Sequence, residues 1–284
     1  MSVDTIIPRR CLLYMPASRP EMFSKAIESG ADVVCVDLED ATADRDKDAL
    51  RLDAINLAAT NKNPKVESIL RINGLRTREG LLDLAALATQ KRVPDGILIP
   101  KVRSAEEVRI VRDVIGMAHP GLGIHLQLET NDGLENAREL AKATHKVRSI
   151  VFGGFDMSSS LRVEPSWNAL LYARQRLVHA AASAHVDIID MPNFDLDDPV
   201  ELTGEAQQAL EIGFTGKCAI HPKQVAAINA VFTPTEEVVA RAKQLIAKFE
   251  AQDQAFTIID GIVMEKPVVE RLYRTIAISE RISR

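Results

Sequence analysis

The sequence predicts an α/β protein built as a (β/α)8 TIM barrel with a C-terminal helical extension. Eight short β-rich runs alternate with helix-like segments along the chain, with no Gly/Ser-rich linker between them. Polar and charged residues stand at the end of several of these runs. In parallel barrels, the carboxyl ends of the strands carry the chemistry. These observations together favour a barrel enzyme.

The expected strands are short runs rich in Val, Ile and Leu, with some aromatic residues. Such residues fit a pleated surface that is covered on both faces. The odd-numbered and even-numbered side chains of each run should therefore face the barrel interior and the surrounding helices in alternation. The runs span residues 11–15, 32–39, 67–73, 96–101, 124–129, 149–156, 186–191 and 216–221.

Helices are expected between these runs and after the last of them. The first seven alternate with the strands and span residues 21–29, 44–59, 78–90, 105–117, 133–143, 167–184 and 199–212. Three more follow the eighth strand, at residues 223–231, 235–250 and 268–283. We therefore expect a catalytic barrel over residues 1–233 and a helical C-terminal segment over residues 234–284.

A doubly wound open sheet is the alternative arrangement for alternating strands and helices. Its dinucleotide-binding form carries a GxGxxG loop between a strand and a helix. This chain lacks that loop; the segment GLGIH at residues 121–125 resembles it, but precedes a strand instead of following one. The barrel is therefore preferred.

The composition excludes several functional classes. The chain has 284 residues, 46% of them hydrophobic, and a formal net charge of −5, so no global basic field is available for nucleic acid. No apolar run approaches the ~18 residues of a membrane span, and the N-terminal residues lack a signal-peptide core. Cys11, Cys35 and Cys218 have no metal-ligand spacing and lie in strand-like runs. This pattern predicts buried thiols in a cytoplasmic protein.

Four of the expected strands bring charged residues to one end of the barrel. Asp37 and Glu39 share the interior face of the second strand, and Arg71 lies near the end of the third. Glu129 ends the fifth strand and Asp156 ends the sixth. Each alone could be part of a structural ion-pair network. Their common position at the barrel mouth favours an active site.

Glu129 and Asp156 are the candidate metal ligands. Neighbouring strands lie roughly 5 Å apart, so two carboxylates at adjacent strand ends can hold one cation. With no Cys or paired His nearby, the expected ion is hard: Mg²⁺, with Mn²⁺ as the alternative. Gly153 and Gly154 should let substrate oxygens approach the backbone closely. Arg71 can hold a substrate carboxylate, which suits a 2-oxo or 2-hydroxy acid bound to the metal.

Other charged residues allow different interpretations. Lys101 ends the fourth strand and could act as a Schiff-base nucleophile in a metal-free aldolase, although the carboxylate pair argues against this. Arg19 and Lys25 follow the first strand, where they could bind the phosphates of coenzyme A or be ordinary solvated charges. His221 could orient loops, bind substrate or be structural.

Several of these residues lie in motifs that, taken together, resemble one family. The sequence is similar to the citrate lyase β-subunit-like proteins, grouped with the malyl-CoA and citramalyl-CoA lyases and the HpcH/HpaI aldolases. The matching segments occur in order over nearly the whole chain: RRCLLYMPASRPEMFSKA, GADVVCVDLEDAT, ILRING, GILIPKVRSAEEV, LQLET, FGGFDMS, GFTGKCAIHPKQV and DGIVMEKPVVERLYRTI.

The resemblance implies a Mg²⁺-dependent carbon–carbon lyase that cleaves a 3-hydroxyacyl thioester of CoA or of an acyl carrier into an acetyl thioester and a 2-oxo acid. It implies Glu129 and Asp156 as metal ligands and Arg71 as the carboxylate clamp. From their place at the barrel mouth, we expect Asp37 to have a catalytic role and Glu39 to bind the substrate. It also implies a homotrimer or hexamer whose C-terminal segment covers the neighbouring active site. Glu265 then stands where the family usually has an acid–base aspartate.

Two other functions are compatible with the same residues. One is a 2-oxo-diacid aldolase that uses no thioester. The other is a β subunit that is active only within a citrate lyase complex. Activity of the purified chain alone would distinguish them from the stand-alone lyase.

Overall fold

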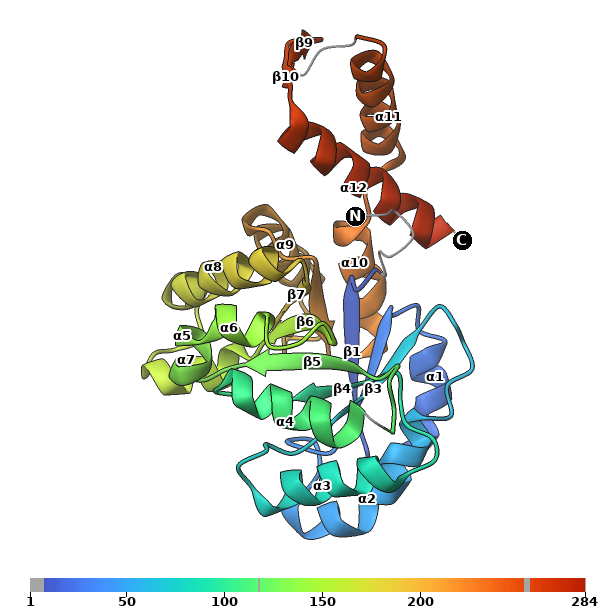
Figure 1. Cartoon of the computed structure of the whole chain (residues 1–284), viewed down its shortest axis with the longest axis vertical. Helices are drawn as coiled ribbons and strands as arrows, with labels where there is room; N and C mark the ends of the chain where they lie inside the picture. The colour runs from blue at the N-terminus through green and yellow to red at the C-terminus, as the bar shows by residue number, and fades with distance from the viewer. Residues whose placement is uncertain (1–7, 117, 253–255, 284) are drawn as a thin grey trace. The chain divides into compact units, whose positions relative to one another are not determined.

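Eight parallel strands close into a barrel in the order β1 to β8 (Figure 1). The computed structural model describes residues 8–116, 118–252 and 256–283. Pairing of β1 with β8, which places Leu12 opposite Cys218, closes the ring. The strands are β1 (Cys11–Pro16), β2 (Val33–Asp37), β3 (Glu67–Arg71), β4 (Gly96–Ile99), β5 (Gly123–Leu128), β6 (Val147–Phe152), β7 (Asp187–Asp190) and β8 (Gly216–Ala219). The predicted TIM barrel is confirmed, and the open sheet is excluded.

Helices follow the strands and cover the outside of the barrel (Figure 1). Among them, α2 packs on β2 and β3, and α8 packs on β6 and β7. The barrel helices are η2 (Pro20–Met22), α1 (Phe23–Ile27), α2 (Asp44–Ala58), α3 (Arg78–Thr89), α4 (Ala105–Gly116), α5 (Asn131–Glu135), α6 (Ala137–Ala141), α7 (Gly154–Leu161), α8 (Trp167–Ala184), α9 (Pro199–Ile212) and α10 (Pro222–Phe232). The predicted bounds of α8 and α9 are confirmed.

Capping residues explain where several of these helices begin and end. Ser166 accepts a hydrogen bond from the amide of Ala169 at the start of α8. Asp198 does the same for the amides of Val200 and Glu201 in the first turn of α9, which begins with Pro199. The helix ends at Ile212, and the next residue, Gly213, adopts the left-handed conformation. These signals are local in sequence, and for this reason the two helices could be predicted to the residue.

The barrel interior is a narrow apolar core. Alternate residues of the strands form one buried cluster, against which Tyr14 packs: Leu12, Val33, Cys35, Ile69, Leu98, Val151, Ile189 and Cys218. The members come from seven different strands, which only the inside of the barrel can bring together. Burial raises the pKa of the Cys35 thiol, as expected for an inert, structural cysteine. The same alternation places Asp37, Arg71 and Gln127 further along the interior face.

The sixth strand is shorter than the sequence predicted. The run over residues 149–156 was expected to be a strand up to Asp156, but β6 ends at Phe152 and α7 begins at Gly154. Asp156 therefore lies in the first turn of a helix, where a carboxylate is favoured by the helix dipole. The residues after Phe152 include no β-branched side chain, so nothing local extends the strand. In an extended strand, alternation would have turned Asp156 away from the interior, since Val151 faces inward.

The residues after the barrel form a second compact unit. The chain divides between Asn229 and Ala230, whereas the expected boundary was at residue 233. This unit contains α11 (Glu236–Glu250), the antiparallel pair β9 (Thr257–Ile259) and β10 (Ile262–Met264), and α12 (Lys266–Ser283). Leu245, Ile259 and Met264 form its buried core. Within the described part of the chain, no helix has the length and apolar character needed to span a membrane.

Candidate active site

A cavity of about 460 Å³ opens at the carboxyl ends of the barrel strands. Most of its lining is aromatic or apolar, including Tyr14, Phe152, Phe155, Pro192 and Phe194. The polar side chains that line it are Asp37, Asp40, Arg71, Gln127, Glu129 and Asp156. A concave site of this size with a few convergent charged groups is suited to a small ligand.

Arg71 and Asp37 form a buried pair at the base of this cavity. The Nε and Nη2 atoms of Arg71 donate to the two carboxylate oxygens of Asp37 at 2.7 and 2.5 Å. The same oxygens also accept from the amides of Glu39 and Ala41. Removing one partner of such a buried pair costs about 3–5 kcal/mol, because it leaves an uncompensated charge. Asp37 is thus fixed as an acceptor that orients Arg71.

A chain of hydrogen bonds connects Arg71 with Glu129. The Nη1 atom of Arg71 lies 3.4 Å from Oε1 of Gln127, which also accepts from the Tyr14 hydroxyl at 3.1 Å. Gln127 in turn donates through Nε2 to Oε2 of Glu129 at 2.6 Å. The other Glu129 oxygen accepts from the backbone amide of Lys101 at 2.8 Å. Both Glu129 oxygens are therefore held in place by neutral donors.

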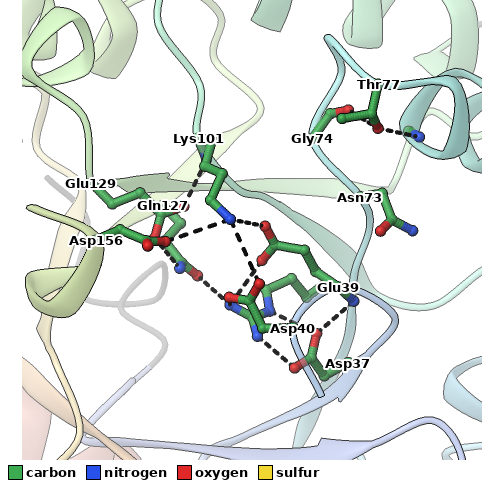
Figure 2. Close-up of polar contacts among 12 residues, drawn as sticks. Asp37, Glu39, Asp40, Asn73, Gly74, Thr77, Lys101, Gln127, Glu129 and Asp156 are labelled. Carbon is green, nitrogen blue, oxygen red and sulfur yellow. Dashed lines mark hydrogen bonds and ion pairs between the residues drawn. The ribbon is translucent and has the colours of Figure 1, made fainter. Parts of the chain in front are cut away.

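Lys101 extends its ammonium group among three carboxylates, as Figure 2 shows. Its Nζ atom lies 2.7 Å from Glu39, 3.6 Å from Asp40 and 3.5 Å from Asp156. The backbone at Lys101 is left-handed, with φ of 52°, an uncommon conformation for a residue other than glycine. Contact with Glu39 and the other carboxylates raises the pKa of the Lys101 ammonium against the effect of partial burial. A Schiff-base lysine requires the opposite shift, so the metal-free aldolase interpretation loses support.

Gly153 is required by the close approach of Glu129. A Cβ atom added at Gly153 would lie 2.3 Å from Oε2 and 2.5 Å from Cβ of Glu129. At Gly154 the added atom would meet the sulfur of Met191 at 2.1 Å. Both glycines line the cavity, as the expected substrate contact requires, and both also permit the local packing.

The site holds more acidic than basic groups. Five carboxyl groups, those of Asp37, Glu39, Asp40, Glu129 and Asp156, face two cations, Arg71 and Lys101. Burial raises the pKa of Glu39 to about 7, although Arg71 and Lys101 oppose the shift. Burial, together with the charges of Glu39 and Asp156, also raises the pKa of Glu129. Such a site gains from an additional positive charge.

The residues present are compatible with a hard divalent cation. One carboxylate oxygen of Glu39 is buried and accepts no well-aligned hydrogen bond, although the Nη1 atom of Arg71 lies 3.1 Å from it. No nitrogen or sulfur ligand competes among the carboxylates. Within residues 8–116, 118–252 and 256–283, no three acidic, His or Cys side chains are already gathered as a complete ligand set. Mg²⁺ does not require one, because it is commonly held by one or two carboxylates and completes its shell with water and substrate.

The other predicted residues of the barrel lie outside the group of carboxylates around Lys101. Arg19 precedes η2, and Lys25 is exposed on α1; neither lines the cavity. The Nδ1 atom of His221 accepts from the amide of Lys223 at the start of α10, which is a structural, capping role. Glu265 is exposed between β10 and α12 in the second unit.

Several residues of the site were not predicted, among them Asp40, Phe155 and Phe194. Asp40 lies next to Glu39 in the segment DLEDA and reaches both Arg71, at 3.5 Å, and Lys101. Phe155 and Phe194 meet edge to face with ring centroids 4.5 Å apart beside the cavity. The acidic run could have indicated Asp40. No local pattern could have brought the two phenylalanines together, since Phe155 lies in the first turn of α7 and Phe194 in the segment between β7 and α9.

The fold and the site define an enzyme class with carboxylates at the mouth of a TIM barrel, and comparison with known proteins identifies the family. Residues 10–222 match the family described as HpcH/HpaI aldolase/citrate lyase. The chain belongs to this family of carbon–carbon lyases, as its motifs predicted.

Similar proteins match along almost the full length of the chain. A (3S)-malyl-CoA thioesterase of Cereibacter sphaeroides is 34% identical over 97% of this chain and 96% of its own. The mitochondrial citramalyl-CoA lyase of Homo sapiens is 29% identical over 97% and 87%. The structure of CitE from Mycobacterium tuberculosis in complex with magnesium, acetoacetate and coenzyme A is 26% identical. It aligns with a TM-score of 0.77 over 98% of this chain and 99% of that one.

Proposed function

We propose that this chain is a Mg²⁺-dependent lyase that cleaves a 3-hydroxyacyl thioester of the malyl-CoA, citramalyl-CoA or citryl type into an acetyl thioester and a 2-oxo acid. The observation that carries the proposal is the set of carboxylates around Glu129 and Asp156, beside a buried arginine, in a chain of this lyase family. Mn²⁺ is a possible substitute, since it accepts the same oxygen ligands. Arg19 and Lys25 remain candidates for contact with the CoA phosphates.

Cleavage breaks the bond between C2 and C3 of the substrate. The proton of the 3-hydroxyl is removed, the C3 oxygen becomes the carbonyl of the 2-oxo acid, and the electron pair of the broken bond passes to the acetyl thioester as an enolate. That enolate then takes a proton at C2. Mg²⁺ held by Glu129 and Asp156 would supply Lewis-acid polarisation of the oxygen on C3 and of the adjacent carboxylate.

The protein's own residues would orient the substrate and exclude water. Asp37 fixes the plane of the Arg71 guanidinium. Its Nη1 atom lies 3.1 Å from a Glu39 oxygen, and a substrate carboxylate would bind there in exchange for that partner. Gln127 and the Lys101 amide hold the Glu129 carboxylate in one orientation. The aromatic lining, with Phe155 and Phe194 beside the cavity, limits access of water to the reacting atoms.

The C-terminal unit would complete the site of a neighbouring subunit. We propose a homotrimer or hexamer in which Glu265 supplies an acid–base carboxylate to the next barrel. Phe256, Ile258 and Val263 are exposed on and beside the hairpin of β9 and β10, and such apolar side chains suit a protein interface. Met264, which is fully buried, anchors the segment before Glu265 within its own unit.

The charge of the cavity favours a 2-oxo acid with a single carboxylate. Arg71 is the one basic side chain among the described residues that line the cavity, and much of the remaining wall is apolar. Mg²⁺ and Arg71 would both be engaged by the first carboxylate, and Lys101 is already paired with Glu39. A second carboxylate, as in oxaloacetate, would then be desolvated without a cation of its own. Pyruvate and glyoxylate avoid this cost.

The purified chain, with no other subunit present, should therefore condense acetyl-CoA with pyruvate or glyoxylate in the reverse reaction. With oxaloacetate we expect kcat/KM to be lower by about tenfold or more, because of the unpaired carboxylate. Formation of the acyl-CoA product, followed by mass spectrometry, measures all three acids in parallel. Equal or faster turnover of oxaloacetate would contradict the assignment. Activity only after addition of other citrate lyase subunits would favour the complex-dependent β subunit.

A further inference from the structure

Lys101 stands among the carboxylates at the mouth of the barrel. Its ammonium group contacts carboxylates from two elements: Glu39 and Asp40 in the loop after β2, and Asp156 in the first turn of α7 (Figure 2). Its backbone amide also donates to Glu129. One residue therefore touches both candidate metal ligands, one through its charge and the other through its main chain.

The local conformation indicates that this position of Lys101 is set by the surrounding structure. The residue has φ of 52°, which costs free energy for any side chain that carries a Cβ atom. The left-handed turn directs the amide toward Glu129, while the side chain returns across the mouth to Glu39. Because 40% of the Lys101 side chain is exposed, the ammonium group has room to move when another cation arrives.

We propose that Lys101 is a resident counter-cation that occupies the carboxylate mouth of the metal-free enzyme and keeps its affinity for a divalent ion low. This inference rests on the metal site of the function proposed above. A divalent ion at Asp156 must either displace the ammonium group, which loses its pairing with Asp156, or bind beside it against charge repulsion. In both cases the positive charge of Lys101 weakens the binding of the metal. Lys101 is therefore a positioning residue: it acts through the metal site and forms no covalent bond to substrate.

The test is a metal-binding titration of the full chain with Mn²⁺ alone, followed by electron paramagnetic resonance, and with Mg²⁺ alone by calorimetry. Replacement of Lys101 by Met keeps the length of the side chain and removes its charge. At a separation of about 4 Å, repulsion between a unit positive charge and a divalent ion lowers the affinity for that ion by about tenfold or more, even in bulk water. Lys101→Met should therefore lower the Kd for Mn²⁺ by about tenfold, whereas Lys101→Arg should leave it within about threefold of the wild-type value.

Matched variants separate this effect from general changes in charge or folding. Lys91 is an exposed lysine in the loop before β4, whereas Lys101 follows the other end of the same strand. Lys91→Met changes the net charge of the protein by the same amount as Lys101→Met. Its Kd for Mn²⁺ should not change. Lys101→Asn provides a second neutral variant, because asparagine tolerates the left-handed backbone well, and it should bind the metal as tightly as Lys101→Met does.

An unchanged or higher Kd for Mn²⁺ in both neutral variants would overturn the proposal, as would equal tightening in Lys91→Met. The titration does not depend on catalysis. If the neutral variants bind metal more tightly but no thioester is cleaved, the role of Lys101 stands and the proposed function fails. If thioester cleavage is observed and the neutral variants do not tighten metal binding, only the role of Lys101 is wrong.

Discussion

Replacing Asp156 with Asn, or Glu129 with Gln, is expected to lower kcat by about a thousandfold or more. Lewis-acid stabilisation of a developing oxyanion is worth several kcal/mol, and each 1.4 kcal/mol corresponds to about tenfold in rate. The amides keep the shape of the carboxylates but remove the charge that would hold Mg²⁺. Initial rates at saturating Mg²⁺ measure the effect directly.

The fold should survive the Asp156 substitution. Its side chain is 44% exposed and pairs with Lys101 at 3.5 Å, so Asp156→Asn should unfold at nearly the wild-type temperature. Asp132 provides a matched control, since it also lies in the first turn of a helix after a barrel strand and is 67% exposed. Asp132→Asn should keep full activity. Wild-type rates in either site variant with EDTA present would show that the metal site is misassigned.

Glu265→Gln is expected to lower kcat by about two to four decades, the usual range for loss of an acid–base group. The Glu265 side chain is exposed in its own unit, and its backbone carbonyl accepts from the amide of Val269 at the start of α12. Exposure within one chain leaves the carboxylate available to a neighbouring barrel. The affinity for Mg²⁺ should hardly change, which separates this variant from those of Glu129 and Asp156.

Subunit mixing tests whether Glu265 acts on another chain. Inactive Glu265→Gln and Arg71→Ala proteins should regain some activity when mixed, because exchange creates sites that contain both intact residues. Glu270→Gln, which changes an exposed carboxylate further along α12, serves as the control and should keep wild-type activity. No recovery in oligomers shown to have exchanged subunits would rule out the cross-subunit role.

Local sequence signals explain the parts of the fold that were predicted well. Strand and helix positions follow from hydrophobic periodicity and from caps such as Ser166 and Asp198, which act within a few residues. The hairpin of β9 and β10 also had such a signal, since Asp260 and Gly261 stand between β-branched residues and both adopt positive φ. That hairpin was missed, although the sequence contained its turn.

Only the part of the site that lies on the strands could be predicted, because the alternation of side chains along a strand determines which of them face the barrel interior. Alternation correctly placed Asp37 on the interior face, and the pairing of β5 with β6 brings the ends that carry Glu129 and Gly153 together. It failed at Asp156, which reaches the mouth because a helix begins at Gly154. The turn at Lys101 and the contact between Phe155 and Phe194 depend on tertiary structure that no local pattern encodes.

The most direct test of the central claim is the identity of the products formed from citramalyl-CoA and malyl-CoA by the purified chain. The proposed lyase predicts acetyl-CoA and a 2-oxo acid, pyruvate or glyoxylate, in equal amounts, formed with Mg²⁺ and abolished by EDTA. Liquid chromatography with mass spectrometry resolves these from free CoA and the intact hydroxy acid. Release of free CoA with no acetyl-CoA would mean that the chain hydrolyses the thioester without cleaving carbon–carbon bonds, and would contradict the account.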